Sequence, residues 1–187
     1  MEQALVFASI IIGVAVSDQI MSLHRLLRSR APVKWHWAQP WFAFIVLLLN
    51  VMIWWSIAST TGGKAALTIG AFLPMLVALI LLALLTASSL PDRIGDDGVD
   101  LAEYYQSNRR YQWTVLGLAT MWNFGSDMAE VARGGAPMLD FLAGRKADIA
   151  ILVVIFAMAF ARRWWLVAIG LAVLSLGPVG WLSRSIG

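Results

Sequence analysis

Long apolar runs, each bounded by charged or aromatic residues, are the feature that most constrains the fold of this chain. The runs at 38–58 and 66–88 each hold about twenty residues. A helix that rises 1.5 Å per residue crosses the roughly 30 Å hydrocarbon core of a bilayer in that length. Only 13% of the 187 residues are charged, against about 25% in soluble domains. The sequence therefore predicts an integral membrane protein.

We predict an all-α fold, a polytopic helical bundle in which residues 1–187 form a single membrane domain. The first and fourth spans reach membrane length only if their polar ends are counted, and the fifth is short. The six predicted spans are 4–25, 38–58, 66–88, 112–132, 147–162 and 164–182.

The segment 91–110 between the third and fourth spans is predicted to lie at the membrane interface. Asp100 and Glu103 have the spacing of a capping box, in which each side chain bonds a free backbone amide at the start of a helix. We therefore expect a short interfacial helix that begins at Leu101.

The distribution of Lys and Arg predicts the orientation of the chain. If both termini lie outside, nine cationic residues fall on the cytoplasmic side and five on the outer side, which agrees with the positive-inside rule. The net charge of +3 then reflects topology, and no nucleic-acid partner is expected. The nine cytoplasmic residues are Arg25, Arg28, Arg30, Lys34, Arg93, Arg109, Arg110, Arg162 and Arg163.

Several kinds of site are excluded or disfavoured by composition. The chain has no cysteine and two histidines, His24 and His36, so we expect no metal site and no cofactor. No arrangement of Ser, His and Asp typical of a catalytic triad is evident, so no catalytic residues are assigned.

Polar residues inside the predicted spans are the candidate functional residues. In the first and fourth spans they recur at spacings of three and four, which places them on one face of each helix. A carboxylate that faces lipid costs several kcal/mol, so these faces are expected to line the bundle interior or a wet cavity. The candidates, for a pathway or binding site, are Asp18, Ser22, Arg25, Asn50, Asn123, Asp127 and Glu130.

Two interpretations of these residues remain open. They can line a functional path, in which Arg25 sets the charge state of Asp18. Alternatively, they can hold helices together, because hydrogen bonds between helices in membranes are common and average well under about 1 kcal/mol.

Two dipeptides occur once in each half of the chain. Ser17-Asp18 recurs as Ser126-Asp127, and Trp54-Trp55 recurs as Trp164-Trp165. With three spans in each half, such a duplication gives the inverted 3+3 repeat found in many transporters. Coincidence is the alternative explanation for matches this short.

Two segments, HRLLRSRAPVKWHWAQPWF (24–42) and EYYQSNRRYQW (103–113), resemble an uncharacterised family of small bacterial polytopic membrane proteins. The resemblance implies a location in the bacterial inner membrane. It implies no site residues, because no activity is attached to that family.

Our leading interpretation is a channel or transporter for a proton, a small cation or a small solute. The alternative is a non-catalytic membrane subunit or sensor that binds a partner membrane protein, and a membrane enzyme acting on a lipid or small molecule comes third. Ser9, Gly13 and Ser17 place small residues on one face of the first span, which lets helices approach closely within the chain or in a homo-oligomer.

Overall fold

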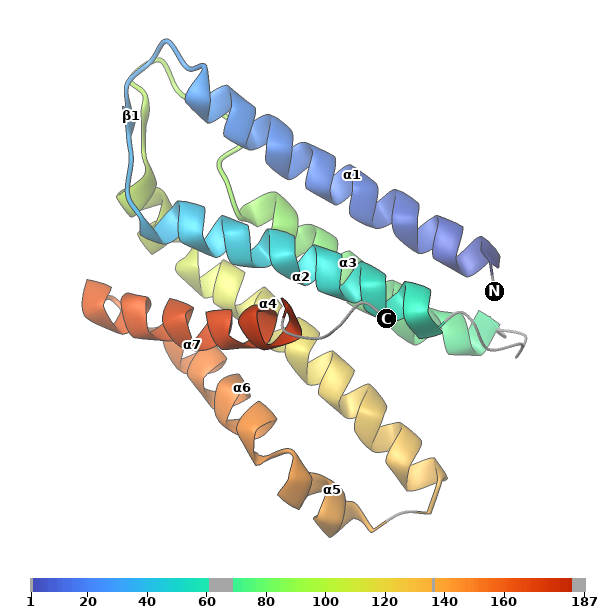
Figure 1. Ribbon diagram of the computed structural model, residues 1–187. Helices are drawn as coiled ribbons and strands as arrows, with labels where there is room; N and C mark the ends of the chain where they lie inside the picture. Colours follow the sequence, from blue (N-terminus) through green and yellow to red (C-terminus); the bar gives the residue numbers. More distant parts are fainter. Residues whose placement is uncertain (1, 61–68, 136, 183–187) are drawn as a thin grey trace.

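Seven α-helices make up almost all of the computed structural model, which describes residues 2–60, 69–135 and 137–182 (Figure 1). The helices are α1 (Glu2–Leu27), α2 (Ala38–Thr60), α3 (Ile69–Ser88), α4 (Leu101–Arg133), α5 (Met138–Gly144), α6 (Lys146–Met158) and α7 (Trp164–Leu182). Two short strands, β1 (Val33–Lys34) and β2 (Val99–Asp100), pair in parallel. The all-α prediction is confirmed.

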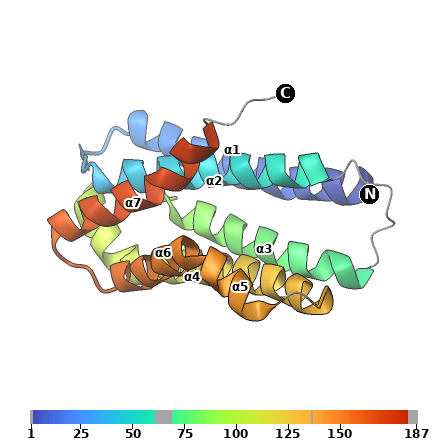
Figure 2. The ribbon, with the colours of Figure 1, turned by 60° about the horizontal axis from the view of Figure 1, so that its bottom comes forward.

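The long helices run back and forth between two ends of the molecule. In Figure 2, α3 lies between a layer of α1, α2 and α7 and a layer of α4, α5 and α6. One end, which we term the basic end, is where α1, α3 and α6 finish and where α2, α4 and α7 begin (Figure 1). The nine cationic residues counted above lie in or next to these helix ends. The opposite end, where α4 finishes and α3 begins, is termed the far end.

The start of α4 confirms the predicted helix start at Leu101 and the capping role of Asp100. The side chain of Asp100 accepts hydrogen bonds from the backbone amides of Ala102 and Glu103, and the helix begins at Leu101. The prediction of a separate short helix before the fourth span is wrong, because α4 continues for 33 residues to Arg133. No glycine or proline occurs between 101 and 116, so the change to apolar residues near 112 alters the surroundings of the helix and not its backbone.

Two further boundaries differ from the prediction. The fifth span was expected at 147–162, but α6 ends at Met158, and the residues before Trp164 form the turn to α7. The seven-residue helix α5 was not predicted, because its short amphipathic segment lies between loop residues that favour a turn. The predicted start of the third span, at 66–68, lies outside the described residues.

Within the described residues, three helices are long and apolar enough to cross a membrane: Leu5–Leu27, Ala38–Ser59 and Trp164–Trp181. The length and apolar composition of these helices indicate a membrane protein. Six spans are not confirmed, since α6 has 13 residues and rises only about 20 Å. The 3+3 repeat is not confirmed either, because the counterpart of α6 in the first half, α2, has 23 residues.

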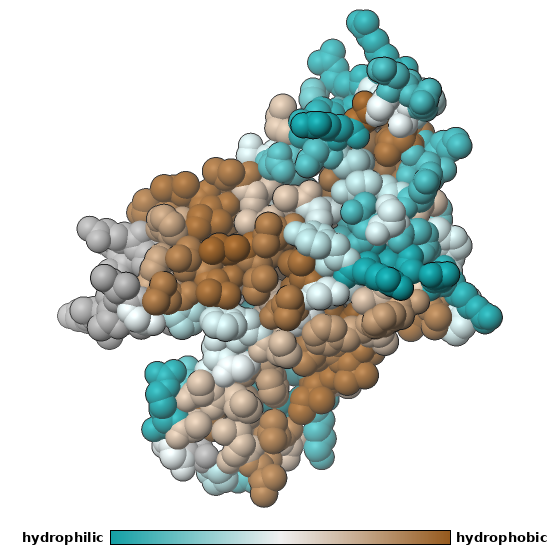
Figure 3. Space-filling model, turned by 180° about the vertical axis from the view of Figure 1, so that it is seen from behind, coloured by the Kyte–Doolittle hydropathy of each residue, from teal (hydrophilic) through white to brown (hydrophobic). Residues whose placement is uncertain are grey.

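Figure 3 shows apolar surface over the middle of the molecule and hydrophilic residues gathered at the basic end, on the right of that view.

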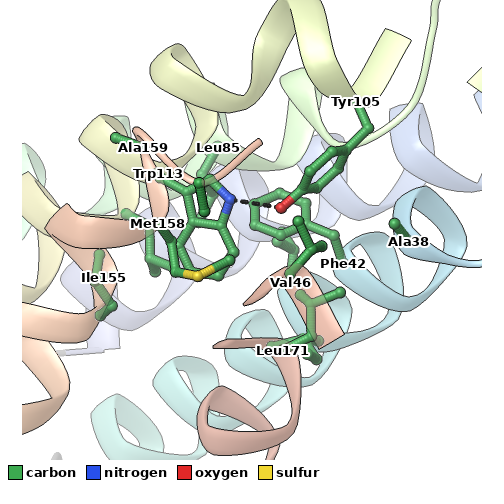
Figure 4. Close-up of a cluster of buried hydrophobic side chains, with 14 of the residues drawn as sticks. Ala38, Phe42, Val46, Leu85, Tyr105, Trp113, Ile155, Met158, Ala159 and Leu171 are labelled. Carbon is green, nitrogen blue, oxygen red and sulfur yellow. Dashed lines mark hydrogen bonds between the residues drawn. The ribbon is translucent and has the colours of Figure 1, made fainter. Parts of the chain in front are cut away.

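The main core lies in the half of the bundle nearer the basic end (Figure 4). Trp113 of α4 is fully buried, and its indole Nε1 donates a hydrogen bond of 2.9 Å to the hydroxyl of Tyr105. The ring of Phe42 from α2 packs 5.6 Å from the Trp113 ring, centre to centre. Leu85 of α3, Ile155 of α6 and Leu171 of α7 belong to the same cluster, so it joins five helices.

Candidate functional site

A groove of about 820 Å³ opens between the far-end halves of α3 and α4. Its polar lining comes mainly from α4 and includes Ser126, Asp127, Glu130 and Arg133. Since Asp127 and Glu130 are three residues apart, both carboxylates lie on the same side of the helix. Two of the candidate residues, Asp127 and Glu130, therefore line the groove.

A smaller cavity of about 240 Å³ adjoins the groove between α2, α3 and α4. Asn123 lines this cavity, and Ser126 lines both spaces. Trp122 and Pro74 also line both, and the indole Nε1 of Trp122 donates a 2.8 Å hydrogen bond to the carbonyl oxygen of Pro74. This bond fixes α4 to α3 where the two spaces meet.

Pro74 removes a backbone donor from the part of α3 that lines the groove. Proline has no N–H, so it cannot donate to the carbonyl four residues earlier in the helix. That carbonyl belongs to Gly70, which also lines the groove. Gly70, whose carbonyl lacks this helical donor, thus lines the same groove as the two carboxylates.

Asp127 is paired with a cation across the bundle. Arg145, between α5 and α6, donates from Nη2 to Asp127 and from Nη1 to Asp148, each at 2.9 Å. These side chains are 43–48% exposed. Hydrogen bonding to Asp148 and the charge of Asp127 raise the pKa of Arg145. Arg145 therefore fixes the turn between α5 and α6 to α4.

Glu130 differs from Asp127 because no ion pair engages it among the described residues. It is exposed and lies in the last turns of α4, where the partial negative charge of the helix end disfavours a carboxylate. Within the groove, Glu130 is thus the carboxylate available to an incoming cation.

Asp18, Ser22 and Arg25 form a second group at the basic end. Arg25 Nη2 lies 3.9 Å from Asp18 Oδ1 and donates to the Ser22 hydroxyl at 3.0 Å. That hydroxyl donates to Asp92 in the loop after α3, at 3.3 Å. Asp18 and Arg25 are each 45% exposed, so this group is not enclosed.

Asn50 stands alone between the two groups. It is fully buried and donates to the Thr86 hydroxyl at 2.8 Å and to the Val46 carbonyl at 2.9 Å. Apolar residues of α1 and α3, among them Leu79 and Leu82, pack between Thr86 and the smaller cavity. The structure therefore brings the candidates together as two groups of three and leaves Asn50 buried between α2 and α3.

A buried set of side-chain amides at the C-terminus of α3 was not predicted from the sequence. Gln39 of α2 donates to the Ser89 carbonyl, and Gln112 of α4 donates to the Ser88 carbonyl at 2.6 Å. Both glutamines are fully buried. They satisfy carbonyl groups that a helix end leaves without intrahelical partners. Their positions at the edges of predicted spans made them appear to be boundary residues.

A tyrosine adds to this capping. The Tyr104 hydroxyl donates to the same Ser88 carbonyl at 3.2 Å. Burial raises the pKa of Tyr104 to about 12, so the hydroxyl keeps its proton and remains a donor. The α3 terminus is therefore held by α2 and α4 through neutral donors.

No group of three or more His, Cys, Asp or Glu side chains is placed to hold a metal ion within residues 2–60, 69–135 and 137–182. The arrangement at the far end is suited to reversible binding of a small polar or cationic group. Comparison with known proteins adds no assignment: no family model, no curated protein and no solved structure matches this chain.

Proposed function

We propose that the protein is a small membrane channel or transporter, and that the groove at the far end is its entrance for a proton, a small cation or a small polar solute. The observation that carries this proposal is that three polar residues spaced four and three apart on α4 line adjoining spaces: Asp127 and Glu130 line the groove, and Asn123 lines the smaller cavity. Polar side chains used only to hold helices together would instead be buried against a neighbouring helix.

The proposed route starts at Glu130 and passes the Asp127–Arg145 pair to the cavity at Asn123. Farther along α3, the next polar position is Asn50 with Thr86, and beyond it lies the group of Asp18 and Arg25. The apolar layer at Leu79 and Leu82 closes the route. In this proposal the structure represents a state open at the far end, and transport requires that layer to separate.

The Trp122–Pro74 hydrogen bond is the contact best placed to change during such a step. Pro74 weakens the first turns of α3, because the helix loses one backbone hydrogen bond there. Movement of this segment would alter both cavities together, since both residues line both spaces.

We further propose the orientation and location expected from the sequence. The basic end faces the cytoplasm, as the positive-inside rule favours. Both termini are outside, the chain crosses six times, and the membrane is the bacterial inner membrane.

Flux measurements in proteoliposomes test the transport proposal, with a pH-sensitive dye and a panel of monovalent cations. Glu130→Gln is expected to lower the initial flux, because it removes the unpaired carboxylate of the groove. Glu103→Gln is the matched control, since Glu103 is an exposed carboxylate on the same helix outside both cavities. No flux in the wild type, or equal flux in the two variants, would show that the proposal is wrong.

A second candidate is a membrane subunit that binds a partner or a second copy of itself. All the buried residues of α4 lie between Leu101 and Gly117, and large apolar residues such as Leu118 and Met121 are exposed farther along. A helix from another chain could cover them. Because the chain has no cysteine, Met121→Cys supplies a single crosslinking position. A crosslinked homodimer or a stoichiometric foreign partner would favour this candidate.

A further inference from the structure

A buried arginine in the basic-end half of α4 has no carboxylate partner among the described residues. Arg109 is 7% exposed. Its Nη1 donates to the backbone carbonyl and to the side-chain Oε1 of Gln106, the latter at 2.9 Å. Its Nε is buried without a hydrogen-bond partner in the described part of the chain. Both contacts of Nη1 are to neutral groups, so the charge of Arg109 is not neutralised by them.

Two further arginines lie nearby, Arg162 in the turn between α6 and α7 and Arg110 on α4 itself. Gln106 Nε2 donates to the backbone carbonyl of Arg162 at 3.2 Å, so one amide side chain connects Arg109 to this turn. Arg110 lies with its guanidinium carbon 6.0 Å from the ring centre of Phe160. Arg110 and Arg162 are exposed. Burial, with the positive charges of Arg162 and Arg110, lowers the pKa of Arg109.

A buried guanidinium with two other positive charges nearby is unfavourable unless an anion joins them. Burial of an unpaired charge costs several kcal/mol even after the surroundings relax. The four ion pairs among the described residues all lie elsewhere. A phosphate group fits this arrangement best, because its several oxygens accept charge-assisted hydrogen bonds from more than one guanidinium.

Aromatic residues beside the cluster indicate the depth at which that phosphate would lie. The ring of Trp164 packs 5.9 Å from Tyr105 and 4.0 Å from His36, centre to centre. Trp and Tyr concentrate at the level of lipid headgroups. Phe160, next to the arginines, is 72% exposed and offers apolar surface to an acyl chain.

We propose that Arg109, Arg110 and Arg162 form a binding site for the phosphate of an anionic membrane lipid. Basic pockets between helices on the cytoplasmic side are suited to such headgroups. Arg162 and Arg110 contact the phosphate from the membrane surface, and Arg109 contributes its charge from beneath. The site does not depend on the proposed transport function, since it lies at the opposite end from the groove.

Native mass spectrometry of the purified full chain tests this site. The probes are phosphatidylglycerol, phosphatidylcholine with the same acyl chains, and inorganic phosphate. The wild type is expected to retain phosphatidylglycerol over phosphatidylcholine. Arg162→Gln is expected to reduce that retention about tenfold, which corresponds to about 1.4 kcal/mol, because it removes a charge-assisted hydrogen bond to the phosphate.

The variants in this experiment are at exposed arginines, because replacement of the buried Arg109 would also disturb packing. Arg28→Gln, the same change at an exposed position of the basic end, is the control and is expected to behave as the wild type. Equal retention of the two lipids, or equal losses in the Arg162 and Arg28 variants, overturns the proposal. Arg162-dependent binding of inorganic phosphate that is as tight as lipid binding supports a phosphate site but assigns its ligand to solution and not to the bilayer.

Discussion

The two halves of α4 differ in how far the rest of the chain covers them. Between Leu101 and Gly117 the helix has eight buried residues, and between Leu118 and Arg133, all of them described, it has none. Both halves belong to one uninterrupted helix, so the difference arises from packing and not from backbone geometry. The basic-end half therefore supplies stability, whereas the far-end half is free to line the groove.

The polar side chains of the two halves differ in the same way. Gln112, in the covered half, is fully buried and bonds another helix. In the uncovered half, Thr120, Asn123 and Ser126 donate to carbonyls one turn earlier in their own helix. Such local bonds do not depend on neighbouring helices, so a rearrangement of the far end would keep them and would mainly affect the contacts of Trp122 with Pro74 and of Asp127 with Arg145.

The largest expected effect comes from truncating an aromatic residue in the covered half. Trp113→Ala should lower the free energy of unfolding by about 3–5 kcal/mol, the usual loss for a fully buried large aromatic. Trp122→Ala should lower it by less than about 2 kcal/mol, because Trp122 is 39% exposed and makes one interhelical hydrogen bond. Unfolding in mixed micelles, followed by circular dichroism, measures both values. Similar losses at the two positions would contradict the division of α4.

Two glycines on α4 allow a finer comparison. A Cβ at Gly117 would lie 2.8 Å from the ring of Phe156 on α6, whereas a Cβ at Gly125 meets nothing within 4 Å. Gly117→Ala should destabilise the protein by about 1 kcal/mol, since crowding outweighs the better helix propensity of alanine. Gly125→Ala should stabilise it by about 0.5–1 kcal/mol. The same micelle assay distinguishes them, and a loss of stability at Gly125 would indicate that another chain covers that face.

The sequence was informative where the controlling interaction is local. The helix start at Leu101 depends on Asp100 and on the backbone amides of Ala102 and Glu103. The spacing of Asp100 and Glu103 in the sequence was therefore sufficient to predict where the helix begins. The apolar character of α1, α2 and α7 likewise follows from their own residues. The pairing of Asp127 with Arg145 depends on how α5 and α6 pack against α4. No short-range sequence pattern predicts that packing. The hydrogen bonds of the buried Gln39 and Gln112 depend on where α3 ends in space. They could not be predicted from the sequence either.

The capping residue of the covered half gives a pH-dependent prediction. The hydrogen bond from the Glu103 amide, with a second from Ala102 and the charge of Lys34, holds the pKa of Asp100 below its ordinary value. A carboxylate with a lowered pKa stabilises the fold above its unfolded pKa, and that contribution is lost as the pH falls through the folded value. We expect stability to fall on acidification below about pH 4, by less than the Trp113 effect.

Two replacements of Asp100 separate its charge from its capping bond. Asp100→Asn keeps an acceptor for the backbone amides and should remove much of the loss at low pH. Asp100→Ala removes the acceptor and should destabilise the protein at neutral pH as well. Thermal unfolding from pH 2 to 7 measures both. An Asn variant that keeps the full acid sensitivity of the wild type would mean that other carboxylates control it.

The smallest expected effect is at the ion pairs of the uncovered half. Arg145→Gln removes the bonds to Asp127 and Asp148, but these side chains are nearly half exposed, and exposed pairs typically contribute about 0.2–1 kcal/mol. We expect a loss of less than about 1 kcal/mol that decreases as salt is added, with Arg133→Gln on the same end as the control. A loss as large as that at Trp113 would show that Arg145 secures the far end as firmly as the core secures the basic end. A small loss leaves Asp127 easily released from its partner, which is what a carboxylate that exchanges Arg145 for a passing cation requires.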